Sequence, residues 1–195
     1  MSDSLYFNKE QAMIRNAVRE FVNKEINPHV DEWEENKIIP LHTLFKKMGD
    51  LGFLGIRYDP KYGGQGLDYW YDLAFVEELG KIDAAGISMA ITVQTHMATP
   101  AIDEFGSDYL KETYLTKAIS GEMVSAIAVT ESGAGSDVSA LATTATRQGD
   151  HYVINGSKIY ITNGTQADFM TLLARTSDDP GYHSFNLFEI GRAHV

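Results

Sequence analysis

The sequence of 195 residues contains no cysteine. Disulfide frameworks, zinc sites built from thiolates and cysteine nucleophiles are therefore excluded. Positive charge is also scarce, because 16 lysines and arginines are outnumbered by 27 aspartates and glutamates, for a formal net charge of -11. Nucleic acids and anionic membrane surfaces are bound by basic faces, so we expect neither as a partner.

Long uninterrupted apolar segments are missing as well. The longest apolar run, Ala84 to Ile102, is broken by Gln94, His96 and Pro100, and it predicts a buried helix rather than a membrane span. Residues Met1 to Asn8 have neither the basic start nor the apolar core of a secretory signal. We therefore expect a cytoplasmic protein. A hydrophobic fraction of 44% still suffices for a packed core.

The six histidines lack the spacing of a metal site. None has a histidine four residues away, and no H-E-x-x-H pattern occurs. His96, inside the predicted helix, is more typical of a hydrogen-bonded core residue than of a ligand. We expect no bound metal.

Helical periodicity dominates the first 120 residues. Asn8 followed by Gln11 is a variant of the capping box, and it predicts a first helix that ends before Pro28. We expect Pro100 to end or kink a later helix. Apolar residues at helical spacing predict four further helices, at about residues 41–51, 68–82, 84–98 and 107–119.

Two features of this helical part have a functional interpretation and a simpler one. Glu77 and Glu78 are adjacent on a helix and cannot face each other as paired carboxylates, so we expect them on or near its solvated face.

The segment Asp59 to Gly66 has three glycines and could be a phosphate loop. No Lys-Ser/Thr pair follows it, so a connector is the favoured interpretation.

The most informative stretch is Val124 to Asp137, an apolar strand that ends in a loop rich in glycine and serine. Gly133 and Gly135 let backbone N–H groups approach an anionic or carbonyl-bearing ligand, and Ser136 adds a hydroxyl. A plain turn between two strands is the alternative. A dinucleotide fingerprint fits less well, because Val138 stands where G-x-G-x-x-G needs glycine or alanine.

Beyond residue 123 the pattern becomes extended, and turn residues such as Asn-Gly separate the segments. The expected strands cover residues 142–147, 151–155, 158–162, 169–174 and 185–188. Their spacing predicts a small antiparallel β-barrel or sandwich. The fold class is thus α+β, with an all-α domain over residues 1–122 and part of a β domain over residues 123–188.

Four motifs in a fixed order make the chain resemble the acyl-CoA dehydrogenase family of flavoproteins across residues 5–188. They are LGFLGI at 51–56, YGGQGL at 62–67, AVTESGAGSD at 128–137 and NGSKIYITNG at 155–164. The resemblance implies an N-terminal helical domain, a middle β domain that binds FAD, and a C-terminal helical domain that is absent here. We therefore expect a truncated member of the family.

The resemblance also implies a split flavin site. In its first half, the strand end near the polar edge of the isoalloxazine is formed by Ile127, Ala128, Val129 and Thr130. The two positions at the pyrophosphate are Gly135 and Ser136. Its second half is Tyr160, Ile161 and Thr162, where Tyr160 replaces the tryptophan of many members and Thr162 matches the hydroxyl near flavin N5. Ser136 also matches a position near the acyl-CoA, and Thr95 and Thr99 are expected to line the acyl-chain pocket.

The implied reaction is α,β-dehydrogenation of a fatty acyl-CoA thioester, with electrons passed to an electron-transferring flavoprotein. A carboxylate removes the α proton while a hydride passes from the β carbon to flavin N5. In the family the base is usually a glutamate of the C-terminal helical domain, so we expect no catalytic residue in this chain. The fragment is then expected to be inactive, and the full-length parent to be a homotetramer.

Other assignments stay open from sequence alone. An acyl-CoA oxidase or a flavin monooxygenase on the same scaffold would share these motifs, and a non-catalytic helical binding module is a further alternative. The tail, residues 189–195, does not continue the family pattern, and one back-translation of it matches a common sequencing adapter. We therefore expect these residues to be non-native.

Overall fold

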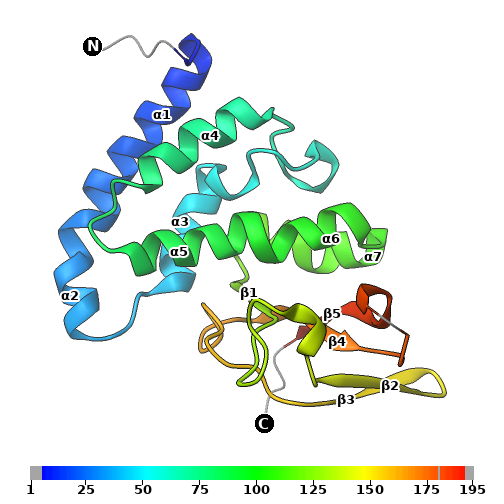
Figure 1. Ribbon diagram of the computed structural model, residues 1–195. Coiled ribbons are helices and arrows are strands. Elements are labelled where there is room, and N and C mark those ends of the chain that lie inside the picture. The colour runs from blue at the N-terminus through cyan, green and yellow to red at the C-terminus, as the bar shows by residue number, and fades with distance from the viewer. Residues whose placement is uncertain (1–5, 180, 192–195) are drawn as a thin grey trace.

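The computed structural model describes residues 6–179 and 181–191. Helices fill the chain up to about residue 122, here called the helical lobe, and a five-stranded sheet with its loops forms the sheet lobe that follows (Figure 1). The α+β class is thereby confirmed. The strand β1 (Ser125–Ala128) begins directly below the central helices and connects the two lobes.

The first helix, α1 (Lys9–Phe21), begins as predicted. The Asn8 side chain accepts from the N–H of Gln11, and the Gln11 side chain accepts from the N–H of Asn8, both at 2.9 Å. The α-helix ends at Phe21, before Pro28, as expected. The helical path continues through a π turn η1 (Val22–Ile26), a 3₁₀ turn η2 (Asn27–His29) and α2 (Val30–Glu35). Pro28 sits in the first turn of η2, where its missing N–H costs little.

The next helices flank a compact connector. The helix α3 (Leu41–Asp50) is followed by Gly52, whose φ of 76° is in the left-handed region that glycine adopts without strain. Two 3₁₀ turns, η3 (Phe53–Gly55) and η4 (Pro60–Tyr62), then lead to α4 (Tyr69–Leu79).

The central helical path is longer than expected. The helix α5 (Ala85–Thr92), the π turn η5 (Val93–Ala98) and α6 (Thr99–Phe105) follow one another without a break. Pro100 therefore does not end the helix: it lies in the first turn of α6, directly after the wider π turn. The last helical segments are α7 (Asp108–Leu110), η6 (Lys111–Leu115) and α8 (Thr116–Ile119).

The sheet differs from the antiparallel barrel or sandwich that was expected. Its further strands and short helices are η7 (Val138–Ala140), β2 (Thr144–Gln148), β3 (His151–Asn155), β4 (Phe169–Arg175), η8 (Gly181–Ser184) and β5 (Phe185–Gly191). The pairs β2–β3 and β4–β5 are antiparallel, but β1 runs parallel to β4, and β2 meets β4 in parallel at Thr144 and Arg175. The sheet of the described residues is thus mixed and does not close.

Residues 158–162 and the start of the tail both lie in the sheet lobe. Residues 158–162 form no strand: they are an irregular segment in which Tyr160 has a φ of 56°. At the other end, Glu189 to Gly191 of the tail complete β5 and pair with β4. Residues 192–195 lie outside the described part, and the non-native origin of the tail stays a prediction.

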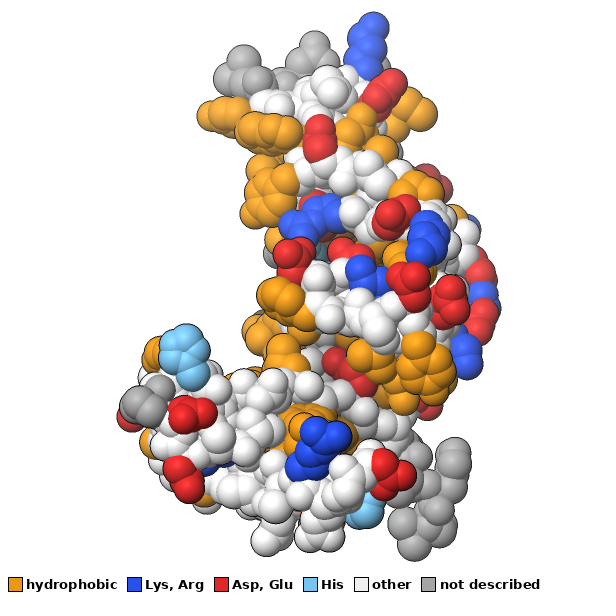
Figure 2. Space-filling model, turned by 90° about the vertical axis from the view of Figure 1, so that its right-hand side faces the viewer, with side chains coloured by type: hydrophobic (Ala, Val, Ile, Leu, Met, Phe, Trp, Pro, Cys, Tyr) orange, Lys and Arg blue, Asp and Glu red, His pale blue; other side chains and the backbone are white. Residues whose placement is uncertain are grey.

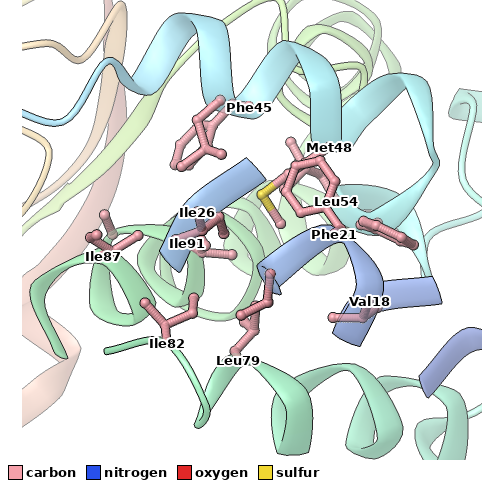
Figure 3. Packing of buried hydrophobic residues seen from close by; sticks show 14 of the residues in the cluster. Val18, Phe21, Ile26, Phe45, Met48, Leu54, Leu79, Ile82, Ile87 and Ile91 are labelled. Carbon is pink, nitrogen blue, oxygen red and sulfur yellow. The ribbon is translucent and has the colours of Figure 1, made fainter. Parts of the chain in front are cut away.

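Buried apolar residues gather in three clusters. The largest lies between α1, α3, α4 and α5 and contains Phe45, Met48, Leu79 and Ile91 (Figure 3). A second cluster joins the lobes, because Phe169 of β4 packs there among residues of α6, η6 and α8. A third, smaller cluster holds the sheet lobe together around Ala128. The second cluster fixes the sheet lobe against the helices.

We predict that Asp68→Ala destabilises the chain by about 1 kcal/mol, the usual cost of losing an N-cap side chain. The Asp68 carboxylate accepts a 2.9 Å hydrogen bond from the N–H of Trp70 at the start of α4. Urea unfolding followed by circular dichroism measures the loss. Asp68→Asn keeps an acceptor and is the control, so equal losses in both variants would contradict the capping role.

Candidate functional site

The first segment of the candidate site is β1 with the loop that follows it. The N–H of Ser125 donates to the side-chain oxygen of the buried Gln94 at 2.7 Å, which ties the start of β1 to η5. Ala126 and Ala128 are buried, whereas Ile127, Val129 and Thr130 are half-buried. After Thr130 the chain turns back on itself. The strand therefore begins in the core, and its end is partly exposed.

The glycine loop offers unused donors next to open space. Glu131 and Ala134 exchange two backbone hydrogen bonds, at 2.9 and 3.2 Å, and close a tight turn. Within the described chain, no hydrogen bond uses the N–H groups of Gly133, Gly135 or Ser136. A Cβ atom at Gly133 or Gly135 would meet no atom within 4 Å. These residues therefore fit a ligand group that is anionic or rich in carbonyl oxygens.

The second segment, residues 158–163, lies against the first. The N–H of Ile159 donates to the carbonyl of Thr130 at 3.0 Å, and the Lys158 ammonium donates to the carbonyl of Val129 at 2.9 Å. The segment is anchored at its other end by Asn163, whose side-chain amide donates to the carbonyl of Ser125 at 3.1 Å. The structure thus brings the two sequence motifs side by side.

The three residues expected to face the flavin in this segment have different surroundings. Tyr160 stands 90% exposed, Ile161 packs at the edge of the third cluster, and Thr162 is half-buried. Tyr160 and Asn163 both have φ in the left-handed region, at 56° and 67°. Such backbone costs energy for a residue with a Cβ, so the surrounding contacts impose it. The roles of these residues, and of Gly135 and Ser136, toward a flavin stay predictions.

A buried ion pair lies between the two segments. Glu131 and Lys158 are 2.8 Å apart, and the side chain of each is 8% exposed. The Glu131 carboxylate also accepts the N–H groups of Ala142 at 2.7 Å and Thr143 at 3.0 Å, and the Thr143 hydroxyl. Sequence reasoning did not select Lys158. Lys158 is the first residue of the strand expected at 158–162, and the local sequence gave no sign that its side chain turns inward.

The contacts of Glu131 decide its protonation state. Burial by itself raises the pKa of Glu131, but hydrogen bonds from Lys158, Thr143 and two backbone amides outweigh it and lower the pKa to about 2. A general base needs a pKa near the working pH and a free oxygen. Glu131 therefore serves as a charged acceptor and not as a base.

The two threonines expected at an acyl pocket are engaged within the helical lobe. The Thr95 hydroxyl donates to the carbonyl of Ile91 at 3.0 Å, and the Thr99 hydroxyl donates to the carbonyl of Gln94 at 2.5 Å. Thr99 is also 2.7 Å from the hydroxyl of the buried Tyr58. Both threonines are buried. Among the described residues neither hydroxyl bonds to the two segments of the site, although η5, which carries Thr95, packs against β1. Their pocket role stays a prediction.

His96 is hydrogen-bonded on both ring nitrogens. Its Nε2 lies 3.0 Å from the carboxylate of the buried Asp72, and its Nδ1 lies 2.6 Å from the Thr95 hydroxyl. The ring also stacks on Phe75. A group of three or more metal-binding side chains is absent from the described residues.

The expectation for Glu78 is wrong. Its side chain is fully buried and lies 3.0 Å from Arg15, 2.6 Å from Arg19 and 2.8 Å from Lys81. Burial tends to raise the pKa of Glu78, but the hydrogen bonds from Arg19 and Lys81 lower it on balance. Glu77 is partly exposed and pairs with Arg15. Glu78 is therefore a charged link between α1 and α4.

Large apolar side chains remain exposed on the helical lobe. They include Trp70 and Leu73 of α4, Met89 of α5 and Met97 of η5. Figure 2 shows the outline hollowed where the two lobes meet, with hydrophobic side chains along the helical edge of that hollow. Hydrophobic side chains along a hollow are typical of an interaction or binding face. No helix within residues 6–179 and 181–191 has the length and apolar character to cross a membrane.

Comparison with known families agrees with this architecture. Residues 8–122 match the family model of the acyl-CoA dehydrogenase N-terminal domain, and residues 126–194 match that of the acyl-CoA dehydrogenase middle domain. The two matches cover most of the chain. The chain belongs to the acyl-CoA dehydrogenase family.

Individual relatives extend beyond this chain. A short-chain-specific acyl-CoA dehydrogenase of Clostridium acetobutylicum is 38% identical over 182 residues, which are 93% of this chain and 48% of the relative. A glutaryl-CoA dehydrogenase of Desulfococcus multivorans is 37% identical over 94% of this chain and 47% of its own length. The chain thus spans about half the length of the curated relatives it matches. Their names also differ in the acyl group.

Solved structures share the fold closely. The acyl-CoA dehydrogenase of Geobacillus kaustophilus has a TM-score of 0.90 and 38% identity, over 97% of this chain and 50% of that one. A structure of the electron transferring flavoprotein of Acidaminococcus fermentans also has a TM-score of 0.90, with 36% identity. The match covers 97% of this chain and 49% of that one. An acyl-CoA dehydrogenase of Bacillus anthracis, solved in complex with FAD, has a TM-score of 0.86 and 30% identity. The match covers 95% of this chain and 31% of that one.

Proposed function

We propose that the chain is the N-terminal and flavin-contacting part of an FAD-dependent enzyme that dehydrogenates fatty acyl-CoA thioesters between the α and β carbons. The observation that carries this proposal is the side-by-side placement of the two motifs, through Ile159 and Thr130, next to unused N–H donors of the glycine loop. Membership of the family supplies the reaction class. The electron acceptor we propose is an electron-transferring flavoprotein, and the proposed location is the cytoplasm.

The residues present fit FAD in two places. The open loop at Gly135 and Ser136 would bind the pyrophosphate with backbone N–H groups and a hydroxyl. The backbone of Ile127 to Thr130 and the segment Tyr160 to Thr162 would hold the isoalloxazine. FAD, when bound, supplies the acceptor for the hydride. The chain's own contribution is to orient that ring, and the exposed Tyr160 is free to cover it.

Proton abstraction from the substrate is proposed to depend on a residue outside this chain. The buried carboxylates of Glu131 and Glu78 are both held in ion pairs, so neither is free to take the α proton. The exposed apolar side chains of α4 and α5 are the surface we propose is covered by the remaining half of the longer protein. We propose that this longer protein is a homotetramer and that the isolated chain has no turnover.

A chimera tests the proposed function. We would join this chain, cut after residue 188, to the C-terminal half of the Clostridium acetobutylicum relative, and compare it with the isolated chain. We expect the isolated chain to bind FAD weakly or not at all without turnover. The chimera is expected to bind FAD and to reduce an electron-transferring flavoprotein with acyl-CoA thioesters of short, medium or long chain. Formation of hydrogen peroxide instead would identify an oxidase, and absence of flavin from both would favour a non-catalytic module.

Two glycine variants provide a matched control in that chimera. Gly135→Val places a branched side chain in front of the proposed pyrophosphate donors, where the space is open, so folding should survive. We expect FAD to bind at least about tenfold more weakly, as for the loss of one or two hydrogen bonds to a charged group. Gly86→Val, on α5, also meets no atom within 4 Å and lies outside the loop. Equal affinities of the two variants would place the pyrophosphate elsewhere.

A further inference from the structure

The pair Glu131 and Lys158 has no role in the function proposed above, yet it lies between both segments of the site. Each side chain is 8% exposed, so the pair is largely removed from water. Burying two charges is costly, and a buried ion pair is by itself weak evidence for stability. A buried pair placed between the two proposed ligand-binding segments points instead to a requirement for one particular arrangement.

The contacts of the pair reach four separate pieces of the chain. Lys158 donates to the carbonyl of Val129 at 2.9 Å, at the end of β1, and to Glu131 at 2.8 Å, at the base of the glycine loop. The Glu131 carboxylate accepts the N–H groups of Ala142 and Thr143, immediately before β2. The neighbouring Ile159 holds the second segment to Thr130. One salt bridge therefore joins the strand end, the loop, the approach to β2 and the second segment.

The charge of the pair also bears on the loop. Glu131 directly precedes the residues whose free N–H groups would bind an anion, and a lone carboxylate there would repel it. Lys158 cancels that charge while contacting the carboxylate directly. The Lys158 ammonium thus keeps the two segments in contact, and it also makes the electrostatic potential at the loop less negative.

We infer that Glu131 and Lys158 are positioning residues of the flavin site: the pair holds the two flavin-binding segments at a fixed separation and neutralises the loop toward the pyrophosphate. This inference rests on the proposed function. It assigns no chemical step to either residue.

Amide hydrogen exchange on the 195-residue chain tests the inference without cofactor. Lys158→Met should speed exchange at Ile159 and Thr143 by at least about tenfold, the factor for about 1.4 kcal/mol. Lys158→Arg keeps a cation and donors, and we expect it to restore most of the protection. Glu78→Gln is the matched control: it disturbs a buried carboxylate of the helical lobe. It should raise the exchange rates of amides in α1 and α4. The exchange rate at Ile159, relative to the rates in the rest of the sheet lobe, should stay unchanged.

FAD titration of the same variants, followed by flavin fluorescence, provides the functional measurement. Lys158→Met should weaken FAD binding by at least about tenfold, more strongly at low salt, whereas Glu78→Gln should leave it within about twofold. Unchanged protection at Ile159 and Thr143 in Lys158→Met would overturn the inference, and so would FAD affinity that falls equally in Glu78→Gln. If the unaltered chain binds no FAD at all, hydrogen exchange alone decides about the pair, and the proposed function is judged by the chimera.

Discussion

Replacing Phe169 with alanine is expected to lower the free energy of unfolding by about 3 to 5 kcal/mol, the range for a buried phenylalanine truncated in a packed core. Phe169 is 1% exposed and begins β4. Its ring lies 5.0 Å from the ring of Tyr114, centre to centre, inside the cluster of helical residues that joins the lobes. The loss includes both the transfer of the ring from water and the cavity that remains.

The position of Phe169 gives this change a consequence for the site. Phe169 is the register partner of Ser125, so a cavity there loosens the start of β1, which leads into the glycine loop. Denaturation in urea, followed by circular dichroism, measures the loss of stability. Leu187→Ala is the control on the neighbouring β5, where the side chain is 44% exposed, and it should cost within about 0.5 kcal/mol. Similar losses in both variants would show that the ring does not join the lobes.

Local signals in the sequence predicted much of the helical lobe. The capping box at Asn8 and the stop at Gly52 were confirmed, because each depends on a few adjacent residues. Pro28 and Pro100 lie where the helix type changes and not where the helical path ends. A proline disfavours the interior of an α-helix, but the 3₁₀ turn at Pro28 and the π turn before Pro100 change the hydrogen-bond spacing, so the helical path continues.

Contacts between distant residues could not be predicted. Residues 158–162 alternate in polarity and are flanked by Asn-Gly, which predicts a strand, yet Lys158 and Ile159 bond to the end of β1 and the strand does not form. Glu78 was expected near solvent, and nothing local indicated that Arg15 and Arg19 of α1 would enclose it. The parallel pairing of β1 with β4 is likewise non-local. That the motif segments form a flavin site stays a prediction, and tertiary contacts determine how these segments meet.

Acid is expected to remove the stabilising contribution of Glu131. The pKa of this carboxyl is lowered from its ordinary value of 4.5 to about 2, because Lys158, Thr143 and two amides bind the charged form against the cost of burial. A depressed folded-state pKa means that the unfolded chain takes up the proton first as the pH falls. The contribution is therefore complete above about pH 4.5 and is lost progressively down to about pH 2. A shift of this size corresponds to about 3 kcal/mol as an upper value.

Comparison with Glu131→Gln isolates this contribution from the other carboxyl groups. Near neutral pH the variant should be less stable, because its single oxygen is neutral where it accepts from Lys158 and Thr143, and its NH₂ group would face the N–H of Ala142 in place of an acceptor. Between about pH 4.5 and 2 the unaltered chain should lose stability more steeply, so that the two urea midpoints converge. Asp150→Asn is the control, since that side chain is fully exposed and its removal should leave the curve in place. Parallel curves for the unaltered chain and Glu131→Gln would mean that the pKa of Glu131 is the same in the folded and the unfolded chain, so that Lys158 and the amides do not favour its charged form. Lys158 would then give the charge of Glu131 no net stabilisation, so the same titration tests the electrostatic basis of the flavin-site inference.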